Sequence, residues 1–294
     1  VAATLADVGA LLTTRADDVS LRVVIKALDQ LRHAPALPPI RALLGHPDGA
    51  TASAAAAAVA SLTGDDAPMG TVVRLLRSES LNVRRAAIED ITAARYVPAL
   101  TAVAVAPNAL VLRTRAVRRL LDAALDAAGG EVRGVWDDAT EATVDALIWD
   151  DPRALDLLGR TNETPRSRDV ARNVRRLFKN DAADAYLAAR TLADVGAAGS
   201  DGHGDGDGGA AAAAARAAAG DAVAAALAAQ PYFDYFGAYH AYKALGWLGH
   251  TPSYNTLLEA ATTLPPRFFN HAAGAATALA AVGDPSAVLG LVGL

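Results

Sequence analysis

Leu81-Asn82-Val83-Arg84-Arg85-Ala86-Ala87-Ile88-Glu89-Asp90-Ile91 is the stretch that decides the fold. It places two aliphatic side chains three positions apart in an alanine-rich run, which favours an amphipathic helix. The first residues of four consecutive pairs of this kind are 31, 29 and 29 positions apart, and those of the last two are 34 apart. All the pairs are Leu28/Leu31, Val59/Leu62, Ile88/Ile91, Val117/Leu120, Leu192/Val195, Leu245/Leu248 and Leu279/Val282. This period is typical of stacked helical repeats, so we predict an all-α solenoid, an α-α superhelix.

The composition supports a large helical core and excludes several kinds of site. The chain has 294 residues, 52% of them hydrophobic and only 5% aromatic. The formal net charge of −5 does not favour a nucleic-acid-binding surface. Because there is no cysteine, disulfides, cysteine-based zinc sites and a cysteine nucleophile are excluded for this chain.

No run of the sequence approaches the ~18 apolar residues that predict a membrane span. The most apolar stretch, residues 210–229, is interrupted by Arg216, Gly220 and Asp221. We therefore expect a soluble helix there and no transmembrane segment.

The rhythm of the repeats divides the chain into four parts. Residues 1–128 are expected to form N-terminal repeats, in which Ser20 caps one helix and Ser78 or Ser80 precedes another. Residues 129–196 form an irregular helical connector that rejoins the repeats, with an acidic stretch and a basic stretch. Residues 197–209 form a flexible Gly/Asp loop, which lacks the bidentate glutamate of a calcium loop. Residues 210–294 form C-terminal repeats.

Aromatic side chains gather in the C-terminal repeats, where ten of the fifteen lie between residues 232 and 269. On a helix, one stripe carries Tyr232, Tyr235, Tyr239 and Tyr242, and the adjacent stripe carries Phe236, His240, Lys243 and Trp247. Such a face suits a flat conjugated ligand, because its rings stack on the ligand and its polar tips select the orientation. The alternative is that these rings are core that closes the last repeat, and the sequence leaves both interpretations open.

Other motifs are few. No Gly-x-Ser-x-Gly elbow, Walker loop or His-Glu-x-x-His motif is present, and the absence of any His-Glu dipeptide argues against a di-iron hydroxylase. Arginines at residues 113, 115, 118 and 119 favour a solvated face or pairing between repeats. A stripe at Arg172, Arg175, Arg176 and Lys179 suits either solvent or an acidic partner.

The repeats resemble HEAT repeats, in the variety found in phycobilin lyases. The resemblance covers Leu21 to Asp122, about a third of the chain, and is to the E subunit of phycocyanobilin lyase. Near the C-terminus, Asn270-His271-Ala272 and Tyr239-His240-Ala241 resemble motifs of F-type and isomerising lyases, with alanine in place of cysteine. The E-type phrases, in order, are residues 21–28, 43–47, 62–65, 83–90 and 96–99.

The resemblance implies a bilin lyase or bilin chaperone that holds an open-chain tetrapyrrole, phycocyanobilin or phycoerythrobilin, as its substrate. It would help attach this bilin to a cysteine of a phycobiliprotein subunit, without a metal and either alone or together with a second lyase subunit. We expect the protein to be located in the cytoplasm of a cyanobacterium or in the plastid stroma of an alga. A non-enzymatic HEAT scaffold that binds a phycobiliprotein or another antenna protein is the alternative, so enzymatic activity stays open.

Within that implied function, local chemistry selects candidate residues. A group that protonates the pyrrole system as the thiolate adds is expected at Asp234 or His240. The other expected bilin-binding residues are Tyr232, Tyr235, Tyr239, Tyr242, Lys243, Trp247 and His271.

Overall fold

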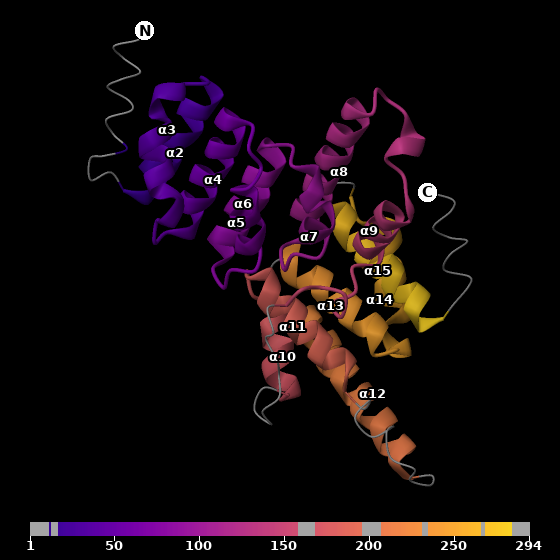
Figure 1. Cartoon of the computed structure of the whole chain (residues 1–294). Helices are drawn as coiled ribbons and strands as arrows, with labels where there is room; N and C mark the ends of the chain where they lie inside the picture. The colour runs from indigo at the N-terminus through magenta and orange to yellow at the C-terminus, as the bar shows by residue number, and fades with distance from the viewer. Residues whose placement is uncertain are drawn as a thin grey trace. The chain divides into compact units, whose positions relative to one another are not determined.

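The computed structural model describes residues 12, 17–157, 168–195, 207–230, 235–265 and 268–283. The elements in these residues are α-helices and short 3₁₀ turns, with no strand among them (Figure 1). The predicted all-α fold is therefore confirmed. The chain forms two compact units. Unit 1 is Val1–Asp150 with Ala154–Leu158, and unit 2 is Asp151–Arg153 with Gly159–Leu294.

Unit 1 consists of helices that pack alternately in two layers, as in a helical-repeat solenoid. The helices of one layer follow one another as direct neighbours, and all but the first pack against shorter helices of the other layer. The first layer is α2 (Asp18–Gln30), α4 (Gly49–Thr63), α6 (Leu81–Ala93) and α8 (Leu110–Ala127). The second is α3 (Leu37–Ala42), α5 (Met69–Leu75), α7 (Leu100–Ala104) and α9 (Asp138–Trp149). The 3₁₀ turns are η1 (Ala34–Ala36), η2 (Leu43–Gly45), η3 (Val97–Ala99) and η4 (Val132–Gly134).

Capping residues fix where these helices begin. Asp17, not the expected Ser20, caps α2, because its carboxylate accepts the backbone N–H of Ser20 at 3.0 Å. Asp48 caps α4 in the same way through Thr51. Ser80 precedes α6, as expected. The aspartate caps satisfy backbone N–H groups that have no partner inside the first turn of a helix.

The repeated aliphatic pairs hold the first layer of unit 1 together. Ile88, Ile91, Val117 and Leu120 are buried in one core cluster, and Val59 in another. Leu31 departs from the pattern, since it follows the last residue of α2 and is 59% exposed. Alanines fill most of α4, and short side chains let neighbouring helices approach closely.

Unit 2 repeats this plan with its own core. The helices α11 (Ala182–Ala193), α13 (Tyr235–Trp247) and α15 (Phe269–Val282) follow one another as neighbours. They pack against α10 (Val170–Leu177), α12 (Asp207–Ala228) and α14 (Tyr254–Thr263), which follows η5 (Thr251–Ser253). The predicted Gly/Asp loop lies mostly outside the described residues.

One described helix has the length and composition of a membrane span. The segment Gly209–Ala228 of α12 has a mean hydropathy of 1.3 and is 17% buried. Figure 1 shows α12 extending beyond the other helices of unit 2. The segment carries Arg216 and Asp221, and one such helix is weak evidence for a membrane span.

Candidate functional site

The predicted aromatic stripe falls partly outside the described residues. Tyr232 and Asp234 lie outside them, and Tyr235 is described only as the first residue of α13. Tyr239 and Tyr242 are 7% and 6% exposed, so both rings are buried in unit 2. Tyr239 packs so closely on α15 that a Cβ at Gly274 would lie 2.8 Å from its Cδ2 atom.

His240, the expected proton donor, lies between two tyrosine rings. Its ring meets Tyr186 of α11 edge-on, with centroids 4.5 Å apart, and Tyr239 at 5.2 Å. The residue is 2% exposed. His271 of α15 is fully buried and meets the edge of Phe268 at 5.7 Å. Both imidazoles therefore belong to the packed interior of unit 2.

Lys243 is a buried cation that sits over an indole ring. Its Nζ atom lies 5.2 Å from the centroid of Trp247, within the range of a cation–π interaction. Burial raises the pKa of the Asp151 carboxyl, but hydrogen bonds from Arg153 and the charges of Arg153 and Lys243 outweigh it and hold that pKa below its ordinary value. Lys243 thus faces negative charge inside its own unit.

Tyr242 is held in its neutral form. Burial raises the pKa of its phenol, and the nearby carboxylate of Glu259 raises it further. At neutral pH the hydroxyl is therefore protonated.

These side chains form the interior of unit 2, which is one of the two interpretations that the sequence left open. Tyr242 belongs to the core cluster of this unit, and Trp247 packs against it. The expected open face is therefore wrong for Tyr239, His240, Tyr242 and Lys243, because neighbouring helices cover them. Their contact with a bilin stays a prediction, as does the role of Asp234.

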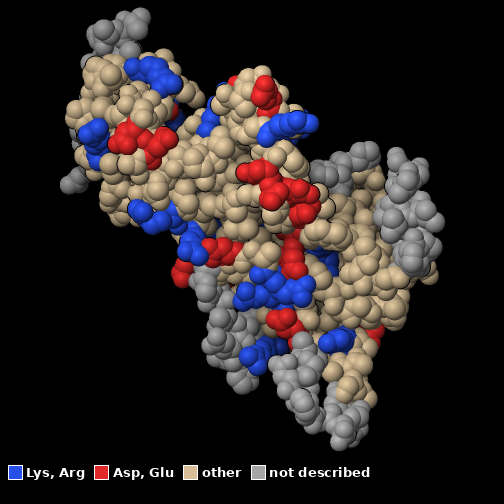
Figure 2. Space-filling view, turned by 45° about the vertical axis from the view of Figure 1, so that its right-hand side comes forward, with Lys and Arg blue, Asp and Glu red and all other residues tan. Residues whose placement is uncertain are grey.

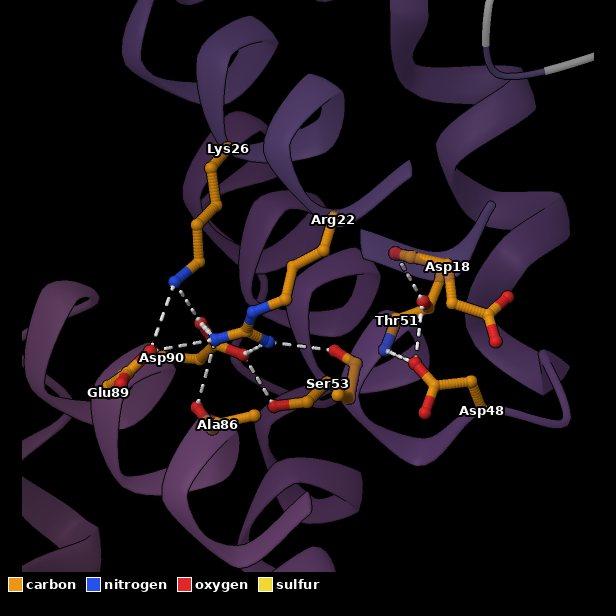
Figure 3. Close-up of polar contacts among 10 residues, drawn as sticks. Asp18, Arg22, Lys26, Asp48, Thr51, Ser53, Ala86, Glu89 and Asp90 are labelled. Atoms are coloured by element: carbon orange, nitrogen blue, oxygen red, sulfur yellow. Dashed lines mark hydrogen bonds and ion pairs between the residues drawn. The ribbon is translucent and has the colours of Figure 1, made fainter. Parts of the chain in front are cut away.

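The sequence did not reveal a charged cluster in unit 1, drawn in Figure 3. Asp90 of α6 is 2% exposed and receives Arg22 of α2 on both carboxylate oxygens, at 2.8 and 2.9 Å. Lys26 lies 3.1 Å from the same carboxylate, and the hydroxyl of Ser53 donates to it at 2.7 Å. Glu89 pairs with Arg22 at 3.2 Å. The spacing of these residues, 68 positions from Arg22 to Asp90, hides the cluster from any local motif.

The cluster joins α2 to α6 across α4. Arg22 of α2 reaches Asp90 of α6 past the start of α4, where it also donates to the carbonyl of Ala50 at 2.8 Å. Ser53 of α4 donates to the same carboxylate. One set of polar contacts therefore ties three consecutive helices of the first layer together.

Two other arginines of unit 1 are fully buried and hold the turns between helices. Arg84 of α6 donates to the carbonyls of Ser78 and Glu79, both at 2.9 Å. Arg113, in the corresponding position of α8, donates to the carbonyls of Asn108 and Ala104 and forms a buried ion pair with Asp150. Pairing between elements, one of the two expectations, is thus confirmed for Arg113. Arg115, Arg118 and Arg119 are exposed.

The surface carries mixed charge. Figure 2 shows basic and acidic side chains interspersed on the face that it draws. Among the described residues, no group of three or more histidine, aspartate or glutamate side chains is placed to hold a metal ion.

The comparisons with known proteins give a distant relative of this chain. The chain is 28% identical over 267 residues to the "Uncharacterized phycocyanin operon protein Y" of Pseudanabaena tenuis. The chain is similar to a phycocyanin operon protein. The match covers 91% of this chain, which spans 57% of the length of that relative.

Two further comparisons add little. No family model matches the chain. Human deoxyhypusine hydroxylase aligns over 99% of this chain and 88% of its own, with a TM-score of 0.31 and 18% identity.

Proposed function

We propose that this protein acts in phycobiliprotein maturation, as a bilin lyase or bilin chaperone that brings an open-chain tetrapyrrole to a cysteine of a phycobiliprotein subunit. The observation that carries the proposal is the similarity to a phycocyanin operon protein over 91% of the chain. The ordered E-type phrases of residues 21–99 support it. The proposal implies that this protein is located in the same compartment as the phycobiliproteins.

Attachment of a bilin to a thiol requires few functional groups from the protein. The protein must orient the bilin beside the acceptor thiol, exclude water and supply one proton. The surface of α6 and α8 in unit 1 offers exposed cations for the two carboxylates of a bilin. Arg85 lies one helical turn before Glu89, and Arg115 and Arg118 lie on the neighbouring α8. His240, Asp234 and the tyrosines of α13 stay candidates for the proton donor and the ring contacts.

The second candidate is a non-enzymatic scaffold that binds a phycobiliprotein or another antenna protein. Burial of Tyr239, His240 and Lys243, at 7%, 2% and 3% exposure, favours this candidate. A ligand cannot stack on rings that neighbouring helices already cover. The scaffold needs only an outer surface that fits its partner.

Absorption spectroscopy separates the two candidates. The protein is mixed with phycocyanobilin, and apo-phycocyanin is then added. A lyase or chaperone is expected to sharpen and red-shift the bilin band and to pass the bilin to the acceptor. An unchanged spectrum, together with binding of the apo-subunit, would leave the scaffold as the function.

Variants then locate the bilin. Trp247→Ala removes a partly buried ring of the candidate site, and Trp136→Ala removes an exposed tryptophan of unit 1 as the control. We expect only the first to weaken bilin binding. Equal bilin affinity in both, with a lower melting temperature for Trp247→Ala alone, would show that Trp247 is core only.

A further inference from the structure

The helix α9 has an unusual distribution of side chains. The residues on its buried side are Thr140, Thr143 and Leu147, so only one large apolar side chain faces the core of unit 1. The large apolar residues Ile148 and Trp149 are 60% and 58% exposed. An amphipathic helix normally turns its large apolar side chains inward. The outer side of α9 therefore carries the large apolar side chains that its inner side lacks.

The inner side of α9 is held by polar contacts instead. The hydroxyl of Thr143 lies 3.1 Å from that of Thr101 of α7. The hydroxyl of Thr140 donates to the carbonyl of Val135 at 3.0 Å. The contact between Thr143 and Thr101 ties the inner side of α9 to α7, and it leaves Ile148 and Trp149 on the outer side.

The C-terminal end of α9 is anchored by a buried charge. Asp150 follows Trp149, has a left-handed backbone with φ of 45°, and forms the buried ion pair with Arg113. Both of these side chains have no exposed area. Because the next residue is fixed in this way, Trp149 is presented from a rigid backbone. Rigid presentation lowers the entropy that a contact surface loses on binding.

Acidic side chains lie on the same outer stripe. Asp138, Glu141 and Asp145 precede Trp149 at positions i−11, i−8 and i−4, which share one helical face. All three are exposed, and none has an ion-pair partner among the described residues. From residue 131 to residue 149 there are five acidic residues and one basic residue, Arg133. The stripe is therefore apolar at one end and negatively charged along its length.

We propose that this outer stripe of α9, formed by Asp138, Glu141, Asp145, Ile148 and Trp149, is a docking surface for a protein partner. The partner fits it by an apolar recess that receives Trp149 and Ile148, bordered by lysine or arginine side chains that face the carboxylates. Tryptophan is enriched among the residues that dominate binding energy, and charges around such an anchor set orientation and rate. The identity of the partner rests on the proposed function, which makes it the phycobiliprotein acceptor subunit.

Calorimetric titration of the full chain with recombinant apo-phycocyanin subunit tests the proposal. Ile148→Ala with Trp149→Ala is expected to weaken binding by about tenfold or more. Its matched control is Val19→Ala with Val23→Ala, which removes two valines of α2 that are 74% and 62% exposed. The control is expected to bind as the unaltered protein does.

A second pair of variants tests the charges without touching apolar contacts. Glu141→Lys with Asp145→Lys is expected to weaken binding and to remove most of its dependence on salt. Asp66→Lys with Asp122→Lys changes the net charge equally, at exposed residues outside α9, and is expected to leave affinity nearly unchanged. Because all four residues are exposed, these substitutions are expected to leave the fold intact, so the test stands even if the tryptophan variant is unstable.

The outcomes are distinct. If the unaltered protein binds the subunit and both α9 variants bind equally well, the docking surface is overturned while the proposed function stands. If both charge variants weaken binding alike, a specific role of α9 is overturned in favour of net charge. If the unaltered protein does not bind the subunit, the proposed function fails and the docking proposal fails with it.

Discussion

At the scale of single residues, Asp90 is the buried carboxylate on which the charged cluster of unit 1 converges. Its side chain is 1% exposed and faces Arg22, Lys26 and Ser53. Without Asp90, Arg22 and Lys26 keep only the exposed Glu89, and the hydrogen bonds to the buried carboxylate are lost. Asp90→Ala is therefore expected to lower the free energy of unfolding by about 1–3 kcal/mol, measured by urea denaturation.

Glu89 is the matched control for Asp90, because it pairs with the same cations from a side chain that is 58% exposed. Exposed pairs are screened by water, so Glu89→Gln is expected to cost less than about 1 kcal/mol. Equal losses for the two variants would contradict a special role for the buried carboxylate.

Asp184 of α11 makes the stability of unit 2 depend on pH. Burial raises the pKa of its carboxyl, but hydrogen bonds and charges from Arg176 and Lys179 outweigh burial and lower that pKa below the ordinary value. A lowered folded-state pKa adds stability above the unfolded value of about 3.9, and that stability is lost as pH falls through the folded pKa. The melting temperature of the unaltered protein should therefore exceed that of Asp184→Asn at neutral pH, and the gap should close below about pH 4.

Asp66→Asn, at an exposed carboxylate of unit 1, is the control for this titration. A gap for Asp184→Asn that stays constant to the lowest pH would show that the variant acts through packing and not through charge.

At the scale of elements, α13 and α15 of unit 2 pack backbone against backbone at Gly246. A Cβ at Gly246 would lie 2.5 Å from the Cα of Ala278, which is backbone and cannot move aside cheaply. Gly246→Ala is expected to destabilise unit 2 by about 1–3 kcal/mol in chemical denaturation. Gly70 of α5 has no atom within 4 Å of the added methyl group. Gly70→Ala should be neutral or stabilising by up to about 1 kcal/mol, and equal losses in both variants would contradict the packing of α13 on α15.

The sequence predicted the elements better than the site, for physical reasons. The pairs Ile88/Ile91 and Val117/Leu120 lie in buried positions of α6 and α8, because a local period reports which side of a helix is buried. The same reasoning could not decide whether the rings of α13 face a ligand or a neighbouring helix. Burial of Tyr239 depends on Gly274, which is 35 positions away in sequence.

Long-range pairs explain the rest of what the sequence missed. The contact of Arg22 with Asp90 spans two repeats, and that of Arg113 with Asp150 depends on the left-handed end of α9. The acidic stretch at residues 136–151 could be recognised from the amino-acid sequence alone. Only the structure divides it into a buried Asp150 and the exposed stripe of α9.

At the scale of the whole molecule, each unit has core clusters of its own. The clusters around Ile88 and Ile25 lie in unit 1, and the cluster around Leu245 lies in unit 2. Residues 1–157 are therefore expected to fold alone, with helical circular dichroism and a cooperative thermal transition. A fragment that melts without cooperativity would show that unit 1 needs the rest of the chain.

The central proposal is that this chain binds a phycobiliprotein subunit and acts in its maturation. Sedimentation velocity of the full chain mixed with apo-phycocyanin subunit measures it most directly. We expect one faster species that contains both proteins at micromolar concentration. Two components that sediment independently at every concentration, with and without phycocyanobilin, would contradict the claim.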